Sequence, residues 1–568
     1  MTTRSLLLAA GCGVAITLAG SALAQGDVSP ADPHEWWKHA VFYELYPRSF
    51  ADSNGDGVGD LNGITSRLDY LKDLGVDAIW IAPCFPSPQV DFGYDVSDYE
   101  QIDPMYGTLA DFDRLSAEAK RRGIRIVLDF VVNHTSDRHA WFVDSRSSRT
   151  SAHRDWFIWR DGQGAGKPPN NWLSTFGGSA WELDPTTGQY YYHYFYVQQP
   201  DLNWRNPAVE KAMLDATRFW YKRGVSGFRL DAVDTLFEDP QLKDDPGLPG
   251  TDKFGRPRLN EIHNTKLPEV HDALKKLRKA ADEYGAVLVG ETWTNDIAEL
   301  KKYYGNGDEV QLPMDFMFTM VNKLSPGEFR KQIAAVDGAG GWPVYVLSNH
   351  DIARSFNRYG DGAHDDAIVK VMAALYLTLR GTPILYYGEE LGMETNDPRS
   401  RDDVRDPIGR LGWPVEKGRD GERTPMQWDA TSNAGFTTGQ PWLPVAPSYP
   451  RKNVAAESKD PASILSFYKG LTALRRSHPA LREGDYVPLA EKDERVLAYL
   501  RRTKDATVLV ALNMSAEPQT LRPEVAAHGS KAVSAKALLG TTRVAGSALA
   551  LDAITLQPFE VVVAELSR

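Results

Sequence analysis

The sequence predicts an α/β fold: a (β/α)8 TIM barrel with a small domain inserted after strand 3 and a C-terminal antiparallel β-sandwich. Three observations support this prediction. Apolar strand-like segments recur eight times, a stretch rich in Trp, Tyr, Gly and Ser interrupts their rhythm once, and β-rich runs dominate the end of the chain. Strands that alternate with helices pair in parallel, and eight such units close into a barrel whose active site lies at the carboxyl ends of the strands.

The first three predicted strands define the start of the barrel. Residues 40–46 and 78–82 are apolar and have the composition of strands. Apolar residues then recur at helical spacing over 109–122, and Gly123 ends that helix. The run 124–129 is the third strand, so a strand, a helix and a strand follow one another as in a parallel crossover.

The alternation of strands and helices stops after the third strand and later resumes. Residues 134–207 show no long helical period and are interpreted as the inserted domain, after which a helix over 209–223 leads to a strand over 225–231. Residues 391–460 are dense in Pro, Gly, Asp and Arg and are interpreted as a long loop after the eighth strand. The other four barrel strands are expected at 286–290, 310–315, 343–347 and 382–387.

The N-terminus has the pattern of a secretory signal peptide. Arg4 gives a short positive region, residues 5–18 are largely apolar, and Ala22-Leu-Ala24 fits the small-residue cleavage rule. A membrane anchor is the alternative, but the apolar run is short and no basic stop-transfer flank follows it. We therefore expect an exported protein, periplasmic or extracellular, with no membrane attachment in its mature form. The predicted domains are the signal peptide 1–24, the barrel 34–133 and 208–484, the inserted domain 134–207 and the β-sandwich 485–568.

The amino-acid composition limits the classes of function that the protein can have. A chain of 568 residues can bury a large core, and its net charge of −12 argues against nucleic acid as a partner. The 15 Trp and 24 Tyr would suit stacking on sugar faces, although most such side chains simply pack in cores. Cys12 would leave with the signal peptide, so Cys84 remains alone and no intrachain disulfide is expected.

Ionised side chains stand at the ends of several predicted barrel strands. Arg229 and Asp231 are two positions apart in Gly227–Val233, so on a strand both point to the same face. A cation this close is expected to lower the pKa of Asp231 and keep it ionised and nucleophilic, whereas an isolated R-x-D is more often a structural ion pair. The other strand-end groups are Asp129, His134, Glu291, His350 and Asp351.

A barrel would bring these groups into one site. Several carboxylates in one pit repel each other, so at least one should have a raised pKa. An ionised nucleophile beside a protonated acid, with carboxyl groups about 5–5.5 Å apart, is what retaining glycoside hydrolysis requires. A metal site is the alternative use of such a cluster, but the histidine spacing matches no common ligand pattern.

Several separated motifs together resemble the α-amylase family of glycoside hydrolases, and within it the oligo-1,6-glucosidase and α-glucosidase branch. They are Asp129-Phe-Val-Val-Asn-His134, Gln199-Pro-Asp-Leu-Asn-Trp204, Gly227–Val233, Glu291 and Asn349-His-Asp351. The resemblance implies that Asp231 is the nucleophile, that Glu291 is the general acid and then the base, and that Asp351 is the third carboxylate, which steadies the distorted sugar.

The same resemblance implies the residues that bind the terminal glucose. Tyr94 would stack on the ring, Asp91 would accept hydroxyl hydrogen bonds, and Arg423 would lie near the pocket mouth. For Phe195, ordinary core packing is an equal alternative. The full implied set is Asp91, Tyr94, His134, Phe195, Gln199, Arg229, His350 and Arg423.

A loop after the first strand resembles half of an EF-hand. Alternate oxygen ligands at Asp52, Asn54 and Asp56, the carbonyl of Val58 and the carboxylate of Asp60 predict a structural Ca2+ or Mg2+ site. The branch that the chain resembles has such a loop; the alternative is a Gly/Asp turn without an ion. No organic cofactor is expected.

The expected function is that of a retaining, exo-acting α-glucosidase on short oligosaccharides. Ala232 follows the nucleophile, and in this branch alanine or threonine there accompanies α-1,4 cleavage whereas valine accompanies α-1,6 cleavage. The alternatives are an oligo-1,6-glucosidase, a sucrose- or trehalose-acting transglucosidase or isomerase, and a non-catalytic barrel. Residues 316–324 lack the paired arginines of sucrose isomerases. The sequence leaves the oligomeric state open.

Overall fold

The computed structural model describes residues 35–567, so the predicted signal peptide lies outside the described residues. Eight parallel strands form the predicted barrel, in the order β11-β10-β7-β3-β2-β1-β13-β12, which follows the chain around the ring and confirms the fold class. No pairing joins β11 to β12, so the ring is nearly closed. The strands are β1 (Phe42–Leu45), β2 (Ala78–Ile81), β3 (Arg125–Val131), β7 (Gly227–Asp231), β10 (Val287–Gly290), β11 (Leu312–Pro313), β12 (Val344–Val346) and β13 (Thr382–Tyr386).

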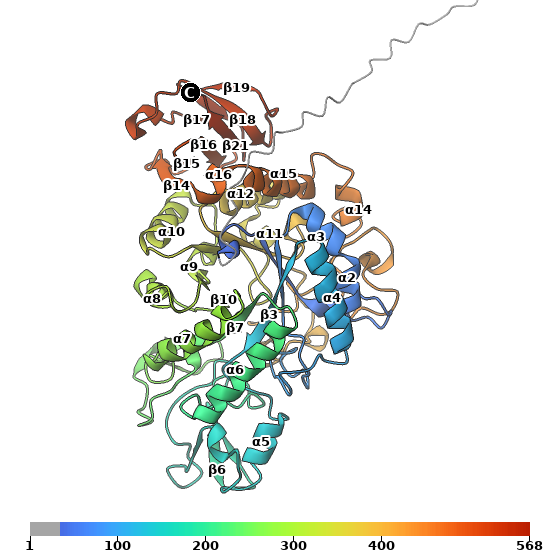
Figure 1. The fold of residues 1–568 in the computed structure, drawn as a ribbon, viewed down its shortest axis with the longest axis vertical. Coiled ribbons are helices and arrows are strands. Elements are labelled where there is room, and N and C mark those ends of the chain that lie inside the picture. Colours follow the sequence, from blue (N-terminus) through green and yellow to red (C-terminus); the bar gives the residue numbers. More distant parts are fainter. Residues whose placement is uncertain (1–34, 568) are drawn as a thin grey trace, which may run out of the picture.

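Helices cover the outside of the barrel (Figure 1). α6 begins at Pro207, two residues earlier than its periodicity predicts, because Asn206 caps its first turn and proline suits the first helical position. The helices are α1 (Pro47–Phe50), α2 (Leu61–Ser66), α3 (Leu68–Leu74), α4 (Leu109–Arg121), α6 (Pro207–Lys222), α7 (Glu269–Asp282), α8 (Ile297–Lys302), α9 (Phe316–Thr319), α10 (Pro326–Gly338), α11 (Ser355–Tyr359), α12 (Asp365–Thr378), α15 (Ile464–Ser477) and α16 (Pro479–Glu483). Among residues 35–567, no helix is both long and apolar enough to span a bilayer.

The chain that leaves β3 builds the inserted domain, at the bottom of Figure 1. It contains helix α5 (Ala140–Ser145) and an antiparallel sheet in the order β4-β6-β5. Its own small core is aromatic and includes Trp172, Trp181 and Tyr192. The three strands are β4 (Trp159–Arg160), β5 (Trp181–Asp184) and β6 (Gln189–Tyr192).

Two further segments follow β7 and β13. A hairpin of β8 (Gly247–Thr251) and β9 (Pro257–Leu259) extends from the loop after β7. The loop after β13 contains only short helices, among them α13 (Pro407–Gly412) and α14 (Val454–Glu457). Both segments contribute to the cavity described below.

The C-terminal sandwich lies at the top of Figure 1 and has an apolar core between its sheets. Its larger sheet is antiparallel in the order β14-β15-β16-β21-β18-β19, and the smaller one pairs β17 with β20. The strands are β14 (Asp485–Leu489), β15 (Val496–Arg502), β16 (Thr507–Asn513), β17 (Gln519–Leu521), β18 (Ser534–Gly540), β19 (Ala548–Ala550), β20 (Ile554–Leu556) and β21 (Val561–Leu566).

Candidate active site

A cavity of about 1200 Å³ opens at the carboxyl ends of the barrel strands. The inserted domain, the segment after β7 and the loop after β13 also contribute to its wall. Four predicted site residues lie behind this wall: Gln199, Arg229, His350 and Arg423, all of them fully buried. The predicted residues on the wall itself are Asp91, Tyr94, His134, Phe195, Asp231, Glu291 and Asp351.

The guanidinium of Arg229 joins three carboxylates. Its Nη1 lies 3.0 Å from Asp129 and 2.6 Å from Asp231, and its Nη2 lies 2.7 Å from Glu291. Strand register explains this convergence, because Arg229 pairs with Asp129 of β3 on one side and with Val289 of β10 on the other. The side chain of Arg229 is completely buried, so little water screens these ion pairs.

Glu291 is held on both oxygens. The backbone N–H of Ala232 donates to Oε2 at 2.8 Å, and the indole N–H of Trp293 donates to Oε1 at 3.0 Å. Ala232 can reach back in this way because it adopts a left-handed conformation (φ 50°, ψ 42°), which turns the chain sharply after Asp231. Asp231 and Glu291, the predicted nucleophile and acid, are therefore linked through one residue.

Burial dominates the ionisation of the carboxylates around Arg229. It raises the pKa of Asp231 well above its usual value, Glu291 and Asp129 reinforce this rise, and Arg229 opposes it. Burial likewise raises the pKa of Asp129 to about 6, again against Arg229. The expectation of a raised pKa in the cluster is met. Arg229 lowers the pKa of Asp231 as expected, but burial outweighs the ion pair, so the expectation of a net lowered pKa for Asp231 is wrong.

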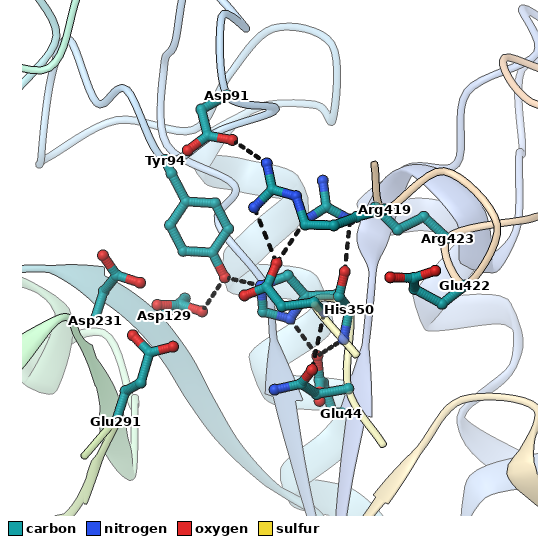
Figure 2. A network of polar contacts seen from close by, with 12 residues as sticks. Glu44, Asp91, Tyr94, Asp129, Asp231, Glu291, His350, Arg419, Glu422 and Arg423 are labelled. Atoms are coloured by element: carbon teal, nitrogen blue, oxygen red, sulfur yellow. Dashed lines mark hydrogen bonds and ion pairs between the residues drawn. The ribbon is translucent and has the colours of Figure 1, made fainter. Parts of the chain in front are cut away.

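Asp351 has the opposite environment. Its Oδ1 accepts from Arg419 at 3.0 Å and from Arg423 at 2.7 Å, and its Oδ2 lies 3.3 Å from His350; Figure 2 labels these three partners. Burial alone would raise the pKa of Asp351, but His350 and the two guanidinium groups hold it below its usual range. Asp351 is therefore a permanent negative charge in the cavity.

Arg423 does not lie where the sequence suggested, and Arg419 was not predicted. Arg423 is fully buried and donates to the carbonyl of His350 at 2.7 Å, so it supports Asp351 from behind and does not border the mouth. Arg419, which sequence reasoning missed, lines the cavity and pairs with Asp91 at 2.7 Å and Asp406 at 2.8 Å. The one sequence feature that could have indicated Arg419 was its position four residues before Arg423.

Tyr94 is on the cavity wall, and His350 is stacked against it from behind. Their rings stack with centroids 5.3 Å apart, and the hydroxyl of Tyr94 donates to Asp129 at 3.0 Å. His350 Nδ1 lies 2.6 Å from Glu44, a fully buried carboxyl on β1 that sequence reasoning also missed. The sequence feature that could have indicated Glu44 is that it is a single charged residue in the apolar run 40–46.

Another part of the cavity wall comes from the inserted domain and the end of β3. Gln199 donates to Asp91 at 3.1 Å and lies 3.1 Å from His134. Burial lowers the pKa of His134 to about 3, so its imidazole is neutral. Phe195 packs against His134 at 5.1 Å between ring centroids and is half-buried on the cavity wall. Aromatic, amide and charged side chains thus lie together on this side of the cavity.

The loop predicted to bind a cation consists of consecutive side-chain turns. Asp52 accepts from the N–H of Asn54, Asn54 from that of Asp56, and Asp56 from that of Val58, at 2.8–2.9 Å. Asp60 caps α2 through Gly63 N–H at 2.8 Å. Within residues 35–567, no three His, Cys, Asp or Glu side chains are grouped closely enough to hold a metal ion, so a cage here would need the amide of Asn54 and the carbonyl of Val58.

Comparison with known proteins places this architecture among sugar-active enzymes. The catalytic domain of α-amylase matches residues 44–484. A probable α-glucosidase of Rhizobium meliloti is 44% identical over 500 residues, 86% of this chain and 90% of that one. An oligo-1,6-glucosidase of Heyndrickxia coagulans is 41% identical over 520 residues, 85% and 92% of the two chains. The crystal structure of a trehalulose synthase from Pseudomonas mesoacidophila superimposes with a TM-score of 0.85 at 38% identity, covering 94% and 99%.

The raised pKa of Asp231 predicts a pH dependence. A carboxyl is protonated below its pKa, so a reaction that needs ionised Asp231 should lose rate as the pH falls through a value above the ordinary aspartate range near 4. Asp129→Asn should move this acid limb to lower pH. It removes a negative charge near Asp231 and one competitor for Arg229, and both changes should lower the pKa of Asp231. The measurement is kcat/KM for p-nitrophenyl α-glucoside against pH. A wild-type limb at pH 4 or below would contradict the prediction.

Proposed function

This chain belongs to the α-amylase family of glycoside hydrolases, and we propose that it is a retaining, exo-acting α-glucosidase that acts on short oligosaccharides. The observation that carries the proposal is the contact of one buried guanidinium with both Asp231 and Glu291, opposite a permanently ionised Asp351. Retaining hydrolysis needs two carboxyl groups close together, one to attack the anomeric carbon and one to protonate the leaving oxygen.

In the proposed mechanism the three carboxyl groups have different tasks. Asp231 attacks the anomeric carbon while Glu291 gives its proton to the glycosidic oxygen, which leaves a covalent glucosyl–Asp231 ester. Glu291, now ionised, takes a proton from water, which attacks the same carbon and releases glucose and free Asp231. The fixed charge of Asp351 stabilises the positive charge that develops on the sugar in both steps.

The closed inner end of the site supports exo action. Arg419 bridges Asp91 and Asp351, and Gln199 fixes Asp91 from the other side, so these side chains form a wall behind the position of one glucose. A longer chain can then extend only outward, toward the exposed mouth. The hydroxyl-binding groups at this wall are charged or amide groups that would discriminate against sugars whose hydroxyls they cannot pair.

An isomerase or transglucosidase is the second candidate, and the likeness to a trehalulose synthase favours it. Residues 316–324, which form α9 and the turn after it, contain no arginine, which favours hydrolysis. The two activities share the glucosyl–enzyme intermediate and differ in whether water or a sugar accepts the glucose. Product analysis on sucrose, maltose and trehalose distinguishes them.

Asp231→Asn should abolish turnover and leave the fold intact. The amide keeps the shape of the side chain but cannot attack, so kcat should fall by several orders of magnitude. Release of p-nitrophenol from the α-glucoside measures the loss, and an unchanged melting temperature shows that the protein is folded. Activity near that of the wild type would refute the proposed nucleophile.

Ala232 is proposed to favour α-1,4 over α-1,6 linkages. Its methyl group is on the cavity wall beside the bond to be cleaved. A 1,4-linked leaving sugar attaches directly through its ring and needs space there, whereas a 1,6-linked sugar has an extra methylene and can swing clear. A change of this size in an apolar pocket shifts discrimination by about 1–3 kcal/mol.

We expect maltose to be preferred over isomaltose in the wild type, and Ala232→Val to erode the preference about tenfold. Because valine is strained at the left-handed φ of this position, the ratio of the two kcat/KM values is the measure, since it does not depend on the folded fraction. Ala232→Gly, which relieves the backbone and adds no methyl, is the matched control and should keep the preference. A wild type that prefers isomaltose tenfold would contradict the assignment.

We also propose that the loop of Asp52, Asn54, Asp56, Val58 and Asp60 holds a structural Ca2+ or Mg2+, and that the protein is exported. Hydrogen bonds from Thr437 and from the N–H groups of the loop overcome the effect of burial and lower the pKa of Asp52, so it would be ionised and ready for a cation. A bound ion would supply only loop rigidity, since the loop contributes no residue to the cavity wall.

Removal of the cation should lower the melting temperature by several degrees. Exhaustive chelation followed by metal-free dialysis tests this, and added Ca2+ should restore the original value. Asp56→Ala is the control, because it should have a low melting temperature that neither chelator nor Ca2+ changes. An unchanged wild-type melting temperature after chelation would count against the site.

A further inference from the structure

We propose that Trp293 is a positioning residue for the acid and base Glu291, and that its indole N–H restricts the catalytic proton to Oε2 of Glu291. This inference rests on the proposed function. Trp293 lies on the cavity wall and is 40% exposed, yet its polar atom points to the carboxylate and not to water.

The two carboxylate oxygens of Glu291 have different neighbours. Oε1 is contacted by the Trp293 indole at 3.0 Å and by Arg229 Nη2 at 2.7 Å, whereas Oε2 accepts one hydrogen bond, from Ala232 N–H at 2.8 Å. A carboxylate oxygen has two lone-pair directions. The indole occupies one direction of Oε1, and the Arg229 cation 2.7 Å away opposes a proton on the other, whereas one direction of Oε2 remains free for a proton.

The position of the proton matters because general acid catalysis depends on geometry. The proton must point to the glycosidic oxygen at hydrogen-bond distance. Without the indole N–H, Oε1 would gain a free lone pair, and the proton could occupy either oxygen. Part of the protonated enzyme would then carry it on Oε1, beside Arg229, where it cannot serve the substrate.

The indole itself is held by a stacked neighbour. The ring of Phe316, at the start of α9, lies parallel to that of Trp293, with centroids 4.1 Å apart and an interplanar angle of 2°. Phe316 is buried and does not contribute to the cavity wall. The stack fixes the plane of the indole, so the N–H can keep its direction although the other face of the ring is exposed.

Trp293→Phe is the test, because it keeps an aromatic ring on Phe316 and deletes only the N–H. At the pH optimum, kcat/KM for maltose should fall about tenfold, whereas p-nitrophenyl α-glucoside, whose leaving group needs little protonation, should change less than threefold.

Phe316→Leu is the matched control: it removes the stacked ring but keeps the indole N–H, so its selective loss of activity on maltose should be smaller than that of Trp293→Phe. Equal losses on both substrates in Trp293→Phe, or an equally large selective loss on maltose in Phe316→Leu, would each overturn the inference. Glu291→Gln separates this failure from failure of the proposed function. If that variant loses maltose hydrolysis, Glu291 remains the acid; if it stays active, the proposed function itself fails.

Discussion

The active site depends on one buried cation. Arg229 has no access to water and contacts Asp129, Asp231 and Glu291, which belong to three neighbouring strands or strand ends. Three carboxylates at this distance could not be buried together without it, because removal of one partner from a buried ion pair costs about 3–5 kcal/mol. The parallel register of β3, β7 and β10 brings the four groups together, so barrel closure and site assembly are the same event.

Carboxyl groups in one cavity acquire different roles from their surroundings. Asp231 and Asp129 share a single guanidinium, so burial raises their pKa values, whereas Asp351 accepts from two guanidinium groups and stays ionised. The loop after β13 supplies both of these arginines, Arg419 and Arg423. A loop segment thus fixes the charge of Asp351, the residue proposed to face the developing positive charge on the sugar.

The sequence was informative where the signal is local. Eight apolar runs predicted eight strands, and Asp231, Glu291 and Asp351 stood out because each is a polar group at a strand end. Long-range partners left no such signal: Glu44 meets His350 across 306 positions, and Arg419 meets Asp91 across 328. Arg423 was misplaced because its loop has no periodicity from which to infer direction. The pKa of Asp231 was misjudged because burial is a property of the whole barrel, not of the R-x-D spacing.

The left-handed turn at Ala232 has a consequence for how such enzymes diversify. Because Ala232, which follows the proposed nucleophile Asp231, also holds the proposed acid Glu291, the separation of the two carboxyls is set by a few covalent bonds and one hydrogen bond at 2.8 Å. A non-glycine residue in this conformation costs on the order of 1 kcal/mol, a small strain for a fixed catalytic distance. The surrounding loops can lengthen, shorten or change sequence without disturbing that distance. New substrate ranges can therefore arise around an unchanged reaction centre.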